Sequence, residues 1–306
     1  MKFDHYSFFM IVLLITNTSP KEYHLITSNG HPSQDPYLTF SSKFKEQCIS
    51  ICGTTRKCHS YTIKQTSSNQ FECQFYDRAT MREDLVRVSH QIRYYINARD
   101  CDDWYNIGAR ASGVYKVNWM GRVSKNIRCN MEIEGGGWIV FHRRYQPITL
   151  DFQRPWNDYK SGFGDPHREF WLGNDFIHEM TASGKHDFLA YAKNYTGETE
   201  ISRYGDFYIE NEIGNYTIHF NETLLAGMAS LTGERNLNGK KFHTYDRDHG
   251  SICISTYLHG PFWFKDCTWL DPNRPDYLRW NHYTGNNDLI QEIQLMFKAT
   301  GGPLLP

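Results

Sequence analysis

Short stretches of the chain alternate apolar and polar residues, a pattern typical of half-buried β-strands. Segments 58–63 and 71–76 alternate in this way and are separated by a polar turn, so we expect an antiparallel pair. Before them, segment 44–52 places two cysteines four residues apart, on one face of a helix. Another strand is expected at 91–96. Residues 35–98 are therefore expected to form a helix held against a small antiparallel sheet.

The second unit, residues 99–298, is longer, and its pattern predicts mainly strands with few helices. Segment 175–181 has the apolar spacing of a short amphipathic helix, with a capping residue just before it. The segments expected as strands are 114–117, 138–141, 206–210 and 216–220, and the last two alternate apolar and polar residues. Taken together, the two units predict an α+β protein.

An apolar run covers residues 8–15, after Lys2 and before the polar stretch 16–20. A helix that crosses a bilayer needs about 20 apolar residues, so this run is too short to span a membrane. Its length and position are typical of a secretion signal, which we place at residues 1–19. The alternative is a buried strand or helix. We expect a secreted, extracellular protein without a membrane span.

The chain has eight cysteines. In the oxidising compartment of a secreted protein, an even number of cysteines predicts that they pair as disulfides. They fall into three groups along the chain, namely Cys48, Cys52, Cys58 and Cys73, then Cys101 and Cys129, then Cys253 and Cys267. A zinc site is the alternative for the first group, but the paired CxxC spacing of such sites is absent. The sequons at Asn194, Asn215 and Asn221 predict N-glycosylation and therefore an exposed surface.

Charge and motifs argue for a binding protein instead of an enzyme. Lysine and arginine number 33 against 34 acidic residues, and no run of like charge occurs, which argues against a nucleic-acid surface. The His178–Glu179 pair lacks the second histidine of a zinc protease helix, because Ala182 stands at that position. If all cysteines pair, no thiol is left as a nucleophile. We expect no enzymatic activity.

The cysteine spacing of the first unit and its Cys58–Tyr61 strand resemble the PAN/apple family. In that family two cysteines of a helix pair with cysteines of neighbouring strands. The resemblance implies the pairs Cys48–Cys73 and Cys52–Cys58, one of three connectivities that four cysteines allow. It also implies a module that binds proteins or carbohydrate.

The second unit resembles the fibrinogen C-terminal domain family in a series of blocks, and the likeness covers nearly all of residues 99–298. The blocks are Gly-Gly-Gly-Trp-Ile-Val-Phe-His-Arg-Arg at 135–144, Asp-Tyr-Lys-Ser-Gly-Phe-Gly at 158–164 and Glu-Phe-Trp-Leu-Gly-Asn at 169–174. The resemblance implies a central, mostly antiparallel sheet and a loop-rich binding subdomain. In this chain Cys101 and Cys129 would join the first strands, and Cys253 and Cys267 would close the binding loop.

The family holds a calcium ion beside that loop through an Asp-x-Asp-x-Asp run. Here the run has Asp246 and Asp248 but Gly250 in the third place, with only Ser251 and Ile252 before the loop cysteine. Calcium takes about six to eight oxygen ligands, which this short run supplies poorly unless Asp246 or Ser251 compensates. The alternative to a calcium site is a plain polar turn.

Lectin-like members of the family bind acetylated sugars or amines between aromatic walls next to that ion. The resemblance places Tyr257 on one wall and Phe262 and Trp263 where the family has paired tryptophans. Tyr277 or Tyr283 would supply a further aromatic, because the segment after Cys267 is shortened. Aromatic faces stack on sugar rings and acetyl methyls, and the alternative for Trp263 and Phe264 is a place in the core.

Two hypotheses of function follow. The first is a secreted, lectin-like recognition protein of innate defence that binds carbohydrate or acetylated groups, with the loop aromatics beside Asp246 and Asp248 as its site. The alternative is an extracellular ligand or adhesion protein that binds a receptor or matrix protein and has no lectin activity. The eroded acidic run motivates this alternative.

Overall fold

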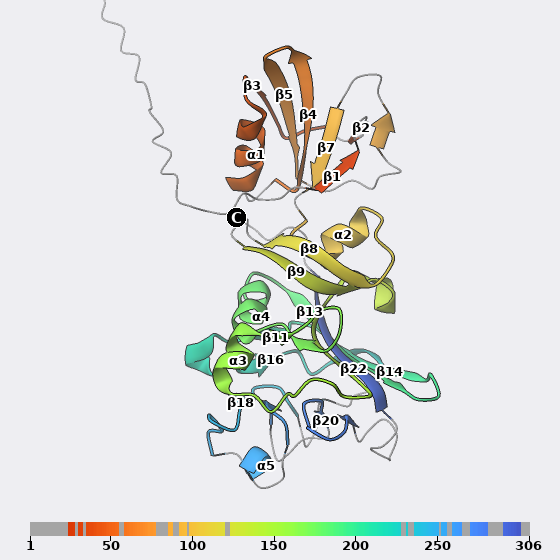
Figure 1. Cartoon of the computed structure of the whole chain (residues 1–306), viewed down its shortest axis with the longest axis vertical. Coiled ribbons are helices and arrows are strands. Elements are labelled where there is room, and N and C mark those ends of the chain that lie inside the picture. Colours follow the sequence, from red (N-terminus) through yellow and green to blue (C-terminus); the bar gives the residue numbers. More distant parts are fainter. Residues whose placement is uncertain are drawn as a thin grey trace, which may run out of the picture.

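The structure is a computed structural model of the whole chain, shown in Figure 1. It describes residues 24–27, 30–32, 35–54, 58–77, 85–87, 92–96, 98–119, 123–227, 231, 236–250, 252–255, 259–264, 270–280 and 290–300. The expected signal at 1–19 lies outside these residues. Among the described helices, none is long and apolar enough to cross a membrane.

The first unit is a helix packed against an antiparallel sheet, as the sequence pattern predicts. In the described residues the sheet has the order β1-β7-β4-β5-β3, and α1 packs beside β3, β4 and β5. The bounds are β1 His24–Thr27, β3 Leu38–Ser42, α1 Lys45–Thr54, β4 Ser60–Ser67, β5 Gln70–Tyr76 and β7 Ile92–Ile96. A separate pair joins β2 (Gly30–Pro32) to β6 (Leu85–Arg87).

Two disulfides hold α1 to this sheet. Cys48 pairs with Cys73 of β5, and Cys52 pairs with Cys58 just before β4. These are the pairs that the PAN/apple resemblance implied. All four cysteines are buried with Tyr61 and Phe75 in one small apolar cluster. So small a core is marginal alone, and each disulfide contributes about 2–4 kcal/mol.

The second unit is built on a sheet of nine described strands. Its order is β11-β12-β10-β22-β13-β14-β17, with β9 also on β10 and β8 on β9, and every described pairing is antiparallel. The bounds are β8 Gly113–Trp119, β9 Val123–Asn130, β10 Trp138–Tyr145, β11 Phe163–Gly164, β12 Phe170–Trp171, β13 His186–Asn194, β14 Thr199–Tyr204, β17 Leu224–Gly227 and β22 Ile290–Ala299. The late strand β22 thus lies between β10 and β13, in the middle of the sheet.

Helices and hairpins surround this sheet. The helices are α2 Cys101–Asn106, η2 Ile133–Gly135, α3 Trp156–Ser161, α4 Asn174–Thr181, η3 Glu212–Gly214 and α5 Ile252–Ser255. The hairpins pair β15 Tyr208–Ile209 with β16 Ile218–His219, β18 Phe242–His243 with β19 Phe262–Trp263, and β20 Leu270–Asp271 with β21 Arg279–Trp280. A third disulfide, Cys101–Cys129, joins α2 to β9.

The strands expected at 206–210 and 216–220 are much shorter than the sequence pattern predicts. Each keeps two paired residues, because the chain between them turns through η3. Asn211 accepts a hydrogen bond from the amide of Gly214 at 3.1 Å and so caps that turn. Turn chemistry therefore overrides the alternating pattern here.

The loop-rich part with β18, α5 and β20 lies at the end of the molecule opposite the first unit (Figure 1). The hairpin β8–β9 and helix α2 lie nearest the first unit. The predicted binding loop is therefore remote from the disulfide-rich unit.

Candidate functional site

The aromatic residues Phe262 and Trp263 belong to the core. The core alternative therefore holds for Trp263, and neither residue forms the pocket wall that the resemblance implied. Both are fully buried, and the β19 strand that carries them pairs with β18. The Trp263 indole N–H donates to the carbonyl of Tyr216 at 2.7 Å. Its ring lies 5.0 Å from that of Phe242 and 5.7 Å from that of Trp171. Because other side chains cover both faces of this short strand, neither Phe262 nor Trp263 is free to stack on a ligand.

The other predicted wall residues have different positions. Tyr277 is half-buried, and the guanidinium of Arg274 lies 4.7 Å from its ring centre. One face of this tyrosine therefore already holds a cation. Tyr257, Tyr283 and Cys267 lie outside the described residues, so their roles stay predictions. Cys253 is buried and disulfide-bonded.

The two acidic residues of the predicted calcium run bind protein donors. Asp246 Oδ1 accepts from the amide of Trp156 at 2.9 Å and from the hydroxyl of Thr244 at 2.7 Å. Asp248 Oδ1 accepts from the amide of Gly250 at 2.9 Å, which closes the turn on itself. Within the described part of the chain, no three histidine, cysteine or acidic side chains cluster as metal ligands would. These residues do not fit a calcium ion, which needs about six to eight converging oxygens.

A buried polar network holds the segments 259–264 and 270–274 to strand β10. Arg144 is fully buried, and its Nη1 donates to the carbonyls of Pro272 at 3.0 Å and Arg274 at 2.6 Å. Its Nε lies 3.8 Å from Oε1 of the buried Glu169. Burial lowers the pKa of the Arg144 guanidinium, and Tyr159 and Glu169 oppose that shift.

Two histidines complete this network. Burial, with the charge of Arg144, lowers the pKa of His142 to about 3, so its ring is neutral and shares a 3.0 Å hydrogen bond with Asn273 Oδ1. Asn273 in turn donates to the carbonyl of Pro261 at 2.6 Å. Nδ1 of the buried His259 lies 2.9 Å from Asp271 Oδ2, and Asp271 Oδ1 accepts from the amide of Gly260 at 3.2 Å. The network fixes the base of the loop from several sides.

Sequence reasoning missed this network, although a signal for it exists. His142 and Arg144 follow the apolar run of β10 directly, and both are buried although they are polar. Polar side chains at inward positions of a strand indicate a buried network, because an unpaired polar group there is costly.

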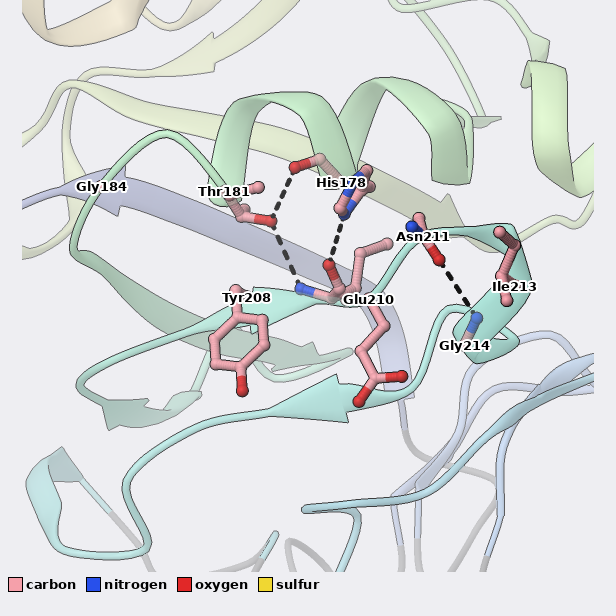
Figure 2. A pocket seen from close by; sticks show the side chains of 10 residues that line it. His178, Thr181, Gly184, Tyr208, Glu210, Asn211, Ile213 and Gly214 are labelled. Carbon is pink, nitrogen blue, oxygen red and sulfur yellow. Dashed lines mark hydrogen bonds between the residues drawn. The ribbon is translucent and has the colours of Figure 1, made fainter.

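A surface hollow of about 710 Å³ lies between α4 and the β15–β16 hairpin (Figure 2). His178 Nδ1 donates to the carbonyl of Ile209 at 2.8 Å, and Thr181 Oγ1 accepts from the Ile209 amide at 3.3 Å. These bonds join the helix to the hairpin. Tyr208 and Ile213 stand on opposite sides of the hollow, with the carboxylate of Glu210 between them.

The rim of this hollow is apolar, exposed and fixed. Ile213 is 91% exposed, the most among the exposed large apolar side chains described, and the capped η3 turn carries it. Tyr208 is also exposed, and its ring stacks on His219 with centroids 4.6 Å apart. His219 Nε2 lies 2.8 Å from Glu210 Oε1. The hollow therefore offers an apolar edge beside a carboxylate.

Comparison with known proteins identifies the class of the second unit. The family of fibrinogen beta and gamma chains, C-terminal globular domain, matches residues 97–295. The chain belongs to this family, and its domain is a fibrinogen-like fold with mainly antiparallel sheets and few helices.

Particular relatives are angiopoietins. Mouse angiopoietin-1 is 31% identical over 217 residues, which is 65% of this chain and 42% of the relative. Human angiopoietin-2 is 30% identical over 217 residues, 66% of this chain and 43% of the relative. The chain thus spans about two fifths of the length of these relatives.

Solved structures agree on the fold. The fibrinogen-like globe domain of human ANGPTL6 has a TM-score of 0.60 and 26% identity, and the match covers 67% of this chain and 96% of that one. A lamprey fibrin D-dimer complexed with a peptide ligand has a TM-score of 0.56 at 20% identity, which shows the fold alone. The fibrinogen resemblance is confirmed, while the PAN/apple resemblance of the first unit stays a prediction because the family match begins at residue 97.

The three sequons differ in how well the folded chain accommodates a glycan. Asn194 is only 5% exposed, and its amide donates to Glu198 Oε2 at 2.7 Å. The side chain of Asn215 is held by Arg247, whose Nη2 donates to Asn215 Oδ1 at 2.9 Å. Asn221 is exposed, and its Oδ1 accepts from the amide of Thr223 at 3.0 Å. We therefore expect Asn221 to be the best glycan acceptor of the three.

We expect Asn221→Gln to remove a glycan from protein secreted by animal cells, and Asn194→Gln to remove none. A glycan on Asn194 would break its buried hydrogen bonds, whereas Asn221 faces solvent. Mass spectrometry of glycosidase-treated and untreated protein measures the occupancy of each site. Full occupancy of Asn194 in folded protein would contradict the ranking.

Proposed function

We propose that this chain is an extracellular ligand whose fibrinogen-like domain binds another protein, a receptor or a matrix component. Its similarity to angiopoietins and ANGPTL proteins favours such a ligand over a lectin. The burial of Phe262 and Trp263 adds to this preference, because a lectin pocket loses two of its expected walls. We also propose that the protein acts outside the cell.

The observation that carries the proposal is the exposed rim of the hollow beside α4. An isoleucine in water on a fixed turn loses little conformational entropy when a partner covers it. Burying such a side chain contributes about 2–3 kcal/mol. Glu210 beside it favours a partner that presents a lysine or arginine next to an apolar residue. We therefore place the docking face at Tyr208, Glu210 and Ile213.

Binding of the full secreted chain to an array of extracellular receptor and matrix domains tests the proposal. For the domain that binds, we expect Ile213→Asp to weaken affinity at least about tenfold, as loss of a central apolar contact does. Leu225→Asp is the matched control, because Leu225 is also exposed and apolar but lies on the edge strand β17. Equal losses in both variants, or no loss in either, would move the docking face elsewhere.

A lectin is the second candidate, because the family resemblance places Tyr257 on the wall of its pocket. A glycan and acetyl-ligand array, read with wild type and Tyr257→Ala, decides between the two. Ligand binding that Tyr257→Ala abolishes would favour the lectin. Binding to a protein domain, without binding to any glycan or acetylated ligand of the array, would support the ligand proposal.

A further inference from the structure

The turn Thr244–Gly250 is tied to helix α3, which lies far away in the sequence. Trp156 is the first residue of α3, and its N-cap residue Pro155 makes no side-chain cap. The carboxylate of Asp246 accepts the free Trp156 amide at 2.9 Å instead. The acid that begins the calcium-like run is therefore used to satisfy a helix end.

The next residue brings a positive charge to the same place. The guanidinium of Arg247 lies 4.0 Å from the centre of the Trp156 ring. Its Nη2 donates to Asn215 Oδ1 at 2.9 Å, and its Nη1 lies 3.6 Å from Glu212 Oε1. One cation thus contacts the aromatic face of Trp156 in α3 and the amide oxygen and carboxylate of Asn215 and Glu212 in the η3 turn.

Glu212 and Trp156 are also joined directly. The Trp156 indole N–H donates to Glu212 Oε1 at 2.8 Å, and Lys160 of α3 binds the other carboxylate oxygen. The hydrogen bond from Lys160, with that from Trp156, lowers the pKa of Glu212, so the carboxylate is charged beside Arg247. Below these groups the Trp156 ring stacks on the buried Tyr216 at 5.3 Å. The contacts form one connected unit.

We infer that Arg247 takes the place of a calcium ion as the cation that fixes this turn, and that the fold of the domain is independent of calcium. The family run has a third acid where this chain has Gly250, whose positive φ of 80° closes the turn. Asp248 then accepts from its own turn instead of offering that oxygen to a metal. The positive charge that a metal would supply is carried by a side chain of the turn itself.

Thermal unfolding of the full secreted chain, with calcium chloride and with EDTA, tests the inference. The two melting temperatures should agree, and titration calorimetry with calcium alone should show no binding heat at the domain. Arg247→Met should lower the melting temperature by about 2–4 °C, because it removes the cation over the Trp156 ring together with the contacts to Asn215 and Glu212. Added calcium should not restore it.

Arg154→Met is the matched control. Arg154 also covers an aromatic ring, that of Phe163, and pairs with Asp158, but both charges lie in the same short segment. Its loss should change the melting temperature by less than about 1 °C. Asp248→Asn, which keeps an acceptor oxygen for Gly250, should leave stability unchanged.

Three results would overturn the inference. They are a melting temperature that EDTA lowers and calcium restores, an Arg247→Met variant no weaker than Arg154→Met, or a calcium-binding heat that Asp248→Asn removes. If Arg247→Met does not fold, Arg247→Lys serves in its place. Lysine keeps the charge but loses the planar, forked guanidinium. The melting temperature of Arg247→Lys should therefore lie below that of Arg154→Met, and its drop from wild type should be smaller than the drop expected for Arg247→Met.

Discussion

Replacing Arg144 by methionine is expected to lower the free energy of unfolding of the fibrinogen-like domain by about 3–5 kcal/mol. The change leaves the carboxylate of Glu169 buried without its cation and removes the donor to the carbonyls of Pro272 and Arg274. Urea unfolding followed by tryptophan fluorescence measures the loss.

The neighbouring Arg143 provides the control for this prediction. Its guanidinium is partly exposed and pairs with Glu292 at 2.7 Å. Arg143→Met should cost about 1 kcal/mol or less. The double variant Arg144→Met with Glu169→Gln should recover part of the loss, because no unpaired charge then remains. A loss of less than about 1 kcal/mol in Arg144→Met would show that the network does not hold the loop.

Trp263→Ala is expected to cost about 3–5 kcal/mol of stability, as removal of a fully buried indole does. The ring fills a space between Trp171 and Phe242, and its N–H satisfies the carbonyl of Tyr216. Denaturant unfolding of wild type and variant gives the difference. A wall residue of a ligand pocket would behave in the opposite way, with unchanged stability and lost ligand affinity.

Trp263→Phe separates the two contributions of this side chain. Phenylalanine keeps most of the apolar volume but loses the donor, so we expect a loss of about 1–3 kcal/mol. A variant as stable as wild type would mean that the hydrogen bond to Tyr216 contributes nothing.

The fold could be predicted well where pattern and family motifs agree. Strand 138–141 is confirmed within β10, which extends to Tyr145, and helix 175–181 is confirmed as α4. The sequence does not show the longer reach of β10, because His142, Arg143 and Arg144 end the apolar run of 138–141. The burial of His142 and Arg144 depends on partners that lie about 130 residues further along the chain, beyond the reach of any local pattern.

The site was harder to predict than the fold for the same reason. The run from Phe262 to Phe264 contains three aromatic residues in succession, and such a run suits a pocket wall as well as a strand covered on both faces. Only the pairing of β19 with β18 distinguishes the two. The contact of Asp246 with Trp156 joins residues 90 positions apart, so the sequence alone could suggest a metal ligand but not a helix cap.

The position of β22 in the sheet has a consequence for biosynthesis. Of the described strands β22 is the last to leave the ribosome, and it is the strand through which β10 and β13 are joined. Until residues 290–299 emerge, β10 and β13 present unpaired edges, and the apolar residues that pack against β22 stay exposed. Local pairs such as β8 with β9, together with the Cys101–Cys129 bond, can form early, whereas closure of the sheet waits for the C-terminal strand. We therefore expect a chain that ends before β22 to leave the edges of β10 and β13 unpaired.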